Sequence, residues 1–158
     1  MKRISKGFFL AFLISVIFSA CQENIYMDWK MANEKYYSDL IQAHKNDTDF
    51  FITSSGLSYK LIHKGWESTW GPNSTDFVKV NYTGRLINNT IFDSQKAGVL
   101  YLPNTIAGWR EVLPKYKTGT KLTLYVPSSL AYDTTTSKMP TIPPYSVLIF
   151  DLELLDKP

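Results

Sequence analysis

Hydrophobic and polar residues alternate along most of the chain beyond residue 55. The alternation runs through residues 57–61, 78–82 and 122–126, and a nearly continuous apolar run covers residues 147–155. A period of two places apolar side chains on one face of a half-buried strand, whereas a continuous run is typical of a strand inside a sheet. Asn88 and Asn89 tolerate the positive φ angles of a tight turn, so we expect a hairpin there.

One short helix is expected between these strands. Its apolar positions lie three and four residues apart, at Trp109, Val112, Leu113 and Tyr116. This spacing gives a helix a single apolar face, which can lie across the sheet. Pro114 removes a backbone hydrogen bond and crowds the preceding turn, so we expect the helix to be short or kinked there.

The start of the chain has the pattern of an export signal. Three basic residues precede an apolar run over residues 7–18, which ends in two small residues directly before Cys21. The run is shorter than the roughly 20 residues that cross a bilayer comfortably. Residues 18–21 resemble a bacterial lipobox, so we expect residues 1–20 to be removed and Cys21 to be lipidated. The alternative is a buried structural thiol behind an ordinary signal. Gln22, in place of an aspartate, favours the outer membrane.

A second helix is expected over residues 24–44, ending at the polar stretch 46–49. Its apolar positions recur at intervals of three and four, at Ile25, Trp29, Ala32, Tyr36 and Leu40. This pattern is typical of an amphipathic helix. The helix could be a spacer between lipid and domain, a docking surface, or a layer packed on the domain. We favour packing, because one tryptophan and two tyrosines would otherwise be exposed.

The composition excludes several classes of function. The chain has 17 Lys and Arg against 14 Asp and Glu. Removal of residues 1–20 takes away three basic residues and no acidic ones, which leaves 14 of each. Without a basic face, nucleic acid is not an expected partner. His44 and His63 are isolated, a single cysteine cannot form an internal disulfide, and neither a G-x-S-x-G elbow nor a P-loop is present.

Three separated segments are expected to converge on one apolar pocket. They are V-N-Y-T-G at 80–84 leading to F-D-S at 92–94, I-A-G-W at 106–109, and I-P-P at 142–144 leading to V-L-I-F-D at 147–151. In order and spacing these motifs resemble the FKBP-type peptidyl-prolyl cis-trans isomerases. The resemblance covers roughly residues 55 to 156.

The resemblance implies an α+β fold. In this family a curved antiparallel β-sheet wraps one short α-helix, and here an extra N-terminal helix would precede it. The expected organisation is a lipoprotein signal peptide at 1–20, a lipidated N-terminus with the amphipathic helix at 21–54, and an FKBP-like domain at 55–158.

The matched motifs carry over a set of pocket residues. The resemblance implies that Trp109 forms the floor, that the Tyr132 hydroxyl meets a substrate carbonyl, and that the Ile106 backbone N–H faces the ligand. The expected site residues are Tyr82, Phe92, Asp93, Ile106, Trp109, Tyr132, Ile142 and Phe150. Neighbouring residues of a regular strand point to opposite faces, so Asp93 joins Phe92 in the pocket only if the strand bends. Each large apolar residue, taken alone, is also an ordinary core residue.

The reaction of this family needs no nucleophile, metal or cofactor. Its obstacle is the loss of amide resonance, a barrier of ~18–20 kcal/mol. The twisted amide carries less charge separation than the planar one, so a dry aromatic pocket penalises the ground state more than the transition state. The resemblance implies proline-containing exported polypeptides as partners, a macrolide as a ligand, and a site of action in the cell envelope.

The chain departs from the family pattern at two places. The segment 94–105 is several residues shorter than in typical members, and residues 97–100 contain no aromatic. Asp133 stands where a glycine commonly follows the pocket tyrosine. A foreshortened wall can leave the cavity wet, so a noncatalytic FKBP-like binding module or chaperone is the alternative function. A third is a structural lipoprotein that contacts its partner through the helix at 24–44.

Overall fold

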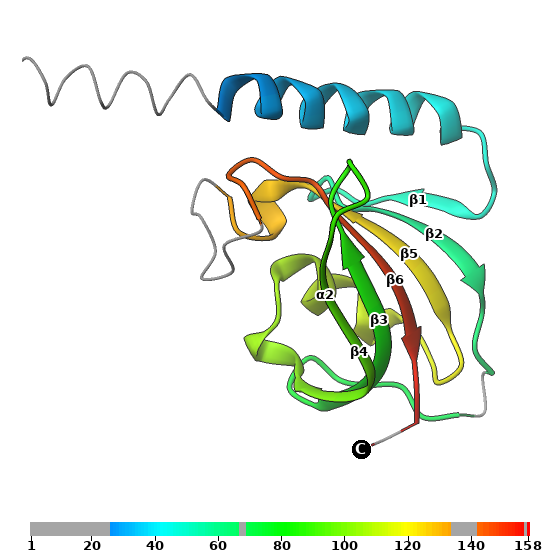
Figure 1. Cartoon of the computed structure of the whole chain (residues 1–158). Helices are drawn as coiled ribbons and strands as arrows, with labels where there is room; N and C mark the ends of the chain where they lie inside the picture. Colours follow the sequence, from blue (N-terminus) through cyan, green and yellow to red (C-terminus); the bar gives the residue numbers. More distant parts are fainter. Residues whose placement is uncertain (1–25, 67–68, 134–141, 157) are drawn as a thin grey trace, which may run out of the picture.

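The structure is a computed structural model that describes residues 26–66, 69–133, 142–156 and 158 (Figure 1). The expected signal peptide at 1–20 and the expected lipidation site Cys21 lie outside the described residues. Within the described part of the chain, no helix is long and apolar enough to cross a membrane.

A six-stranded antiparallel sheet forms the centre of the fold, in the order β1-β2-β5-β6-β3-β4 (Figure 1). The period-two pattern predicted the strands at residues 58–63, 77–85 and 121–126 correctly, and the nearly continuous apolar run is β6, which lies between two neighbours. Of the longest strand, at residues 91–101, only the start was expected. The strands are β1 (Phe50–Ile52), β2 (Ser58–His63), β3 (Phe77–Arg85), β4 (Ile91–Tyr101), β5 (Lys121–Val126) and β6 (Leu148–Leu154).

The predicted hairpin joins β3 to β4. Asn89 adopts a φ of 65°, and the Leu86 N–H donates to the Thr90 carbonyl at 2.9 Å. Asparagine tolerates this left-handed conformation better than most residues, which explains its place in the turn.

The short helix lies in the hollow of the curved sheet (Figure 1). It consists of α2 (Ala107–Val112) followed by a 3₁₀ turn, η2 (Leu113–Lys115). The α-helix gives way to the 3₁₀ turn that contains Pro114, in agreement with the short or kinked helix expected there. Gly108 lets α2 approach the sheet closely, because a Cβ at this position would lie 2.8 Å from Cγ1 of Val126.

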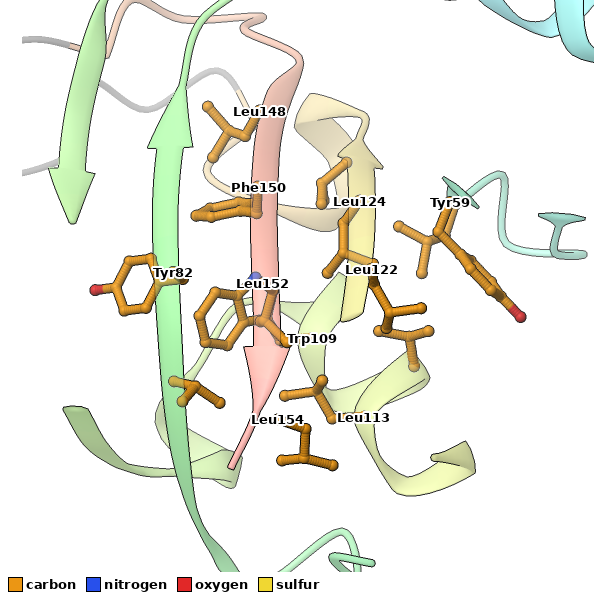
Figure 2. Packing of buried hydrophobic residues seen from close by; sticks show 14 of the residues in the cluster. Tyr59, Tyr82, Trp109, Leu113, Leu122, Leu124, Leu148, Phe150, Leu152 and Leu154 are labelled. Atoms are coloured by element: carbon orange, nitrogen blue, oxygen red, sulfur yellow. The ribbon is translucent and has the colours of Figure 1, made fainter. Parts of the chain in front are cut away.

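The core fills the space between α2 and the concave face of the sheet (Figure 2). Alternate residues of β3 and β5 are buried, and β6 buries nearly all of its apolar side chains. Burial of a leucine stabilises the fold by about 1.5–3 kcal/mol. The leucines at the centre of the core are Leu113, Leu122, Leu124, Leu148, Leu152 and Leu154.

The N-terminal helix, described from residue 26 to 44, packs on the domain rather than extending from it. Trp29 contacts the core, and its Nε1–H donates to Ser146 Oγ at 3.0 Å. At the other end, the Tyr37 hydroxyl lies 2.6 Å from Ser58 Oγ. The preference for packing is therefore confirmed.

Two details of this region differ from expectation. Ala32 is exposed, and the neighbouring Asn33 is buried instead, with 1% of its surface accessible. The spacing of apolar residues could not predict this burial, because Asn33 is polar and is buried through hydrogen bonds to backbone groups. In addition, β1 begins at Phe50, inside the segment assigned to the helix and linker. The boundary expected at residue 55 therefore falls within the sheet.

Candidate functional site

A cavity of about 490 Å³ opens between the sheet and α2. Seven of the eight expected site residues line it: Tyr82, Phe92, Asp93, Ile106, Trp109, Tyr132 and Phe150. Ile142 does not line the cavity. It belongs to the hydrophobic core with 3% exposure, so the structure does not bring this eighth residue together with the other seven.

Aromatic rings form the inner surface of the cavity. Trp109 meets Tyr82 at a centroid distance of 5.0 Å and Phe150 at 5.2 Å, both edge to face. Phe92 stands edge-on to Phe150 at 5.5 Å. Trp109, Tyr82 and Phe150 come from α2, β3 and β6, and Figure 2 shows them beside the leucine core. Edge-to-face contacts favour a fixed arrangement of rings, so the cavity is preorganised.

Gly84 makes this arrangement possible. A Cβ at this position would lie 2.6 Å from Cζ of Phe92 and 2.9 Å from Cε1 of Phe150. Both distances are shorter than any real carbon contact, so the two rings occupy the space that a side chain would need. The glycine of the V-N-Y-T-G motif is therefore required by packing.

A β-bulge explains how Phe92 and Asp93 both reach the cavity. Arg85 pairs with Ile91, and Gly84 pairs with Asp93, which leaves Phe92 as an extra residue in β4. A bulge breaks the alternation of side chains between faces. The bend that the sequence analysis required for Asp93 is thus present.

Asp93 accepts a hydrogen bond of 2.6 Å from the Tyr82 hydroxyl. Burial, together with this bond and the Asp93 charge, raises the pKa of Tyr82. Burial and the same charge raise the pKa of Tyr132. Both hydroxyls therefore keep their protons at neutral pH and can donate hydrogen bonds.

Two N–H groups at the cavity lack an acceptor within the described residues. Trp109 is 3% exposed, and its Nε1–H has no hydrogen-bond partner there. Ile106 precedes α2 and accepts hydrogen bonds from the backbone of Trp109 and Arg110, while its own N–H donates to no described backbone group. An unpaired buried polar group costs about 1–3 kcal/mol. A bound ligand could satisfy the Ile106 N–H, whereas Nε1 of Trp109 has almost no accessible surface.

Seven residues of the lining were not expected from the sequence. Leu100 supplies an apolar wall in the segment where no aromatic was found, and the unbroken run A-G-V-L-Y at 97–101 gave no signal of which side chain faces the cavity. Arg110 directly follows the expected Trp109, but nothing in the sequence placed it at the cavity. The lining residues missed are Leu100, Asn104, Thr105, Ala107, Arg110, Ser129 and Ala131.

Asp133 fits the position where the family commonly has glycine. Its φ is 51°, in the left-handed region that glycine favours. Aspartate tolerates this conformation better than most side chains. Its N–H donates to the Ser128 carbonyl at 2.8 Å, and its carbonyl accepts from the Tyr145 N–H at 3.0 Å. The substitution thus preserves the turn that carries Tyr132.

A second hollow, of about 570 Å³, lies over the outward-facing polar side chains of the sheet, including Asn81, Thr123 and Asp151. It lacks the cluster of rings that lines the first cavity. Within the described residues, no group of three or more His, Cys, Asp or Glu side chains is placed to hold a metal ion. The aromatic cavity is therefore the candidate site.

Comparison with known proteins identifies the family of the chain. A profile of the family described as FKBP-type peptidyl-prolyl cis-trans isomerase matches residues 69–155. The FKBP-type 22 kDa peptidyl-prolyl cis-trans isomerase of Escherichia coli is 39% identical over 108 residues, 66% of this chain and 51% of that protein. Outer membrane protein MIP of Legionella longbeachae is 36% identical over 119 residues, 73% of this chain and 50% of that protein.

The crystal structure of FkpA from Escherichia coli has a TM-score of 0.79 and 31% sequence identity, over 99% of this chain and 75% of that chain. The chain spans about half the length of the curated relatives that it matches. The α+β fold expected from the motifs is confirmed. The chain belongs to the FKBP-type peptidyl-prolyl cis-trans isomerase family.

Proposed function

We propose that this chain is a peptidyl-prolyl cis-trans isomerase that acts on proline-containing exported polypeptides. The observation that carries the proposal is the cavity lined by Tyr82, Phe92, Trp109 and Phe150 in a member of this family. Its size suits a proline ring with the adjoining peptide bonds, and its edge-to-face rings fix its shape.

The cavity favours the twisted amide by excluding water. Rotation about the bond before proline must overcome a barrier of ~18–20 kcal/mol, because the planar amide is stabilised by resonance. The planar form has the larger charge separation and loses more hydration among the aromatic rings than the twisted form does. Interactions that favour the transition state over the ground state raise the rate.

Polar groups at the mouth of the cavity would orient the peptide. The Ile106 N–H supports binding of a substrate carbonyl, since it has no acceptor within the described residues. Tyr132 is 36% exposed, so a substrate carbonyl can approach its hydroxyl. The Asp93 carboxylate fixes the Tyr82 hydroxyl at 2.6 Å and thereby holds one wall.

An isomerisation assay on an Xaa-Pro peptide tests this function, together with refolding of a protein whose slow phase is proline isomerisation. The wild type is expected to accelerate both. Tyr132→Ala is expected to lower kcat/KM about fivefold, as loss of one hydrogen bond to a substrate costs about 1 kcal/mol. No acceleration by the wild type in either assay would exclude the isomerase.

The second candidate is a binding module that holds proline-containing segments without isomerising them. The short segment 94–105 favours this candidate, because a shortened wall can leave the cavity wet. In this segment β4 leads directly into the 3₁₀ turn η1 (Leu102–Asn104), and Leu100 lines the cavity. Such a module would suppress aggregation of an unfolded client and leave the slow refolding phase unchanged. A macrolide should quench or shift Trp109 fluorescence in either case.

We also propose that the protein is anchored to the cell envelope through lipid on Cys21, at the outer membrane. The basic and apolar pattern of residues 1–20 supports this, as does one relative that is named an outer membrane protein. Cys21→Ser is expected to move the protein from the membrane fraction to the soluble fraction. Mass spectrometry of the wild type should show a mature N-terminus at Cys21 that carries acyl chains. An unmodified Cys21 would contradict the anchor.

A further inference from the structure

Arg110 places a positive charge on the rim of the cavity. It follows Trp109 in α2, lines the cavity, and is exposed to solvent. An exposed charge at the edge of a binding site acts on the flanking residues of a ligand rather than on the group inside the cavity. Its effect is on specificity and association more than on chemistry.

The Arg110 side chain is fixed in place by two backbone carbonyls. Its Nη1 group donates to the Pro103 carbonyl at 3.3 Å and to the Thr105 carbonyl. Thr105 belongs to the same cavity wall. A side chain held in this way loses little conformational entropy when it binds a further group.

The other edge of the guanidinium is unused within the described residues. The side-chain hydrogen bonds of Arg110 to described residues are the two from Nη1, and no described carboxylate forms an ion pair with it. By contrast, its neighbour Glu111 pairs with Lys115 at 3.6 Å and accepts a hydrogen bond from Ser55. Arginine keeps three donors at Nε and Nη2, and this edge matches the two oxygens of a carboxylate.

The opposite charge at the cavity belongs to Asp93. Its carboxylate is engaged by the Tyr82 hydroxyl and lies within the wall formed by β4. Asp93 is half-buried, whereas Arg110 is exposed. A flanking side chain of a bound peptide therefore meets a cation on the α2 side before it meets the partly covered anion.

We propose that Arg110 forms a subsite for an acidic side chain next to the bound proline, so that the preferred substrates carry Asp or Glu in that position. The carboxylate binds the Nε and Nη2 edge of the guanidinium. This inference rests on the proposed isomerase function, and it defines the substrate class of the same cavity.

Matched blocked tetrapeptides test the subsite, with isomerisation followed by NMR exchange so that no coupling protease contributes its own selectivity. One pair carries Glu or Gln directly before proline, and the other pair carries them directly after it. For the wild type, kcat/KM is expected to be about two- to fivefold higher for Glu than for Gln in at least one pair, the size typical of an exposed ion pair. The preference should shrink as salt is raised.

Variants assign the preference to one residue. In Arg110→Gln the ratio of kcat/KM for the Glu and Gln peptides should fall to about one, and in Arg110→Glu it should fall below one. Lys115→Gln is the matched control, because this cation pairs with Glu111 and does not line the cavity, so the ratio should stay at the wild-type value. Turnover of the Glu peptide no faster than that of the Gln peptide in both pairs by the wild type would overturn the subsite and leave the isomerase standing. No turnover of any of them would overturn both.

Discussion

Gly84→Ala is expected to lower kcat/KM for an Xaa-Pro peptide by about 10- to 100-fold. The new methyl group would overlap ring carbons of Phe92 and Phe150, which lie 2.6–2.9 Å from its position. Phe150 is already in contact with Trp109 and Tyr82, so the displaced rings move into the cavity. A misplacement of about 1 Å in a binding site can cost about 100-fold in rate. Overpacking should also lower the free energy of unfolding by about 1–3 kcal/mol.

Gly98→Ala is the matched control for this variant. Gly98 lies in β4, and a Cβ there would meet Oε1 of Gln95 at 2.2 Å. That oxygen is the end of a flexible, exposed side chain that can move away. Both variants add one methyl group to the β3–β4 pair, but only at Gly84 would it meet side chains that line the cavity, Phe92 and Phe150. Peptide isomerisation and urea denaturation should separate them. Full activity in Gly84→Ala would show that the aromatic cavity is not the site.

Local pattern was sufficient to predict β2, β3, β5 and β6, because the side chains of a half-buried strand alternate between apolar and polar and those of a central strand are nearly all apolar. It predicted neither β1 nor the length of β4. In β3 every second residue from Val78 to Gly84 is buried, which is the alternation that the sequence shows. The change from α to 3₁₀ geometry was also local, since Pro114 lacks an N–H wherever it stands. Features of this kind depend on the chain within a few residues.

The register between paired strands could not be predicted from the local pattern. The bulge at Phe92 exists because Gly84 and Arg85 pair with residues two positions apart on β4. From the sequence we could therefore predict only that the Asp93 side chain enters the pocket if the strand bends. A second irregularity in the same pair, where Ala97 has a φ of 50°, was not foreseen for the same reason.

The motifs predicted seven residues that the structure brings together at the cavity, and the differences have a common cause. Ile142 precedes a matched Pro-Pro pair, yet its side chain turns into the core. Arg110 lies beside a matched residue and faces the cavity. A motif fixes the position of the backbone, whereas the direction and the neighbours of a side chain are decided by the packed structure. Asn33 shows the same limit, because its role depends on a segment more than 100 residues away.

Asn33→Ala is expected to lower the free energy of unfolding by about 2–3 kcal/mol. The Asn33 side chain accepts a hydrogen bond of 2.8 Å from the Val147 N–H and donates one of 2.8 Å to the Trp29 carbonyl. Both Asn33 and Val147 are buried, so alanine would leave a backbone N–H without a partner inside the protein. An unsatisfied buried donor costs about 1–3 kcal/mol. Urea denaturation measures the loss.

The same substitution should also alter the cavity, because Asn33 is hydrogen-bonded to Val147 in the segment that leads into β6. Within that segment the Tyr145 N–H donates to the carbonyl of Asp133, the residue after Tyr132. We therefore expect kcat/KM to fall severalfold at temperatures where the variant is fully folded. Gln42→Ala removes an exposed amide from the same helix and should change stability by less than about 0.5 kcal/mol. If Asn33→Ala were as stable and as active as this control, the N-terminal helix would not support the domain.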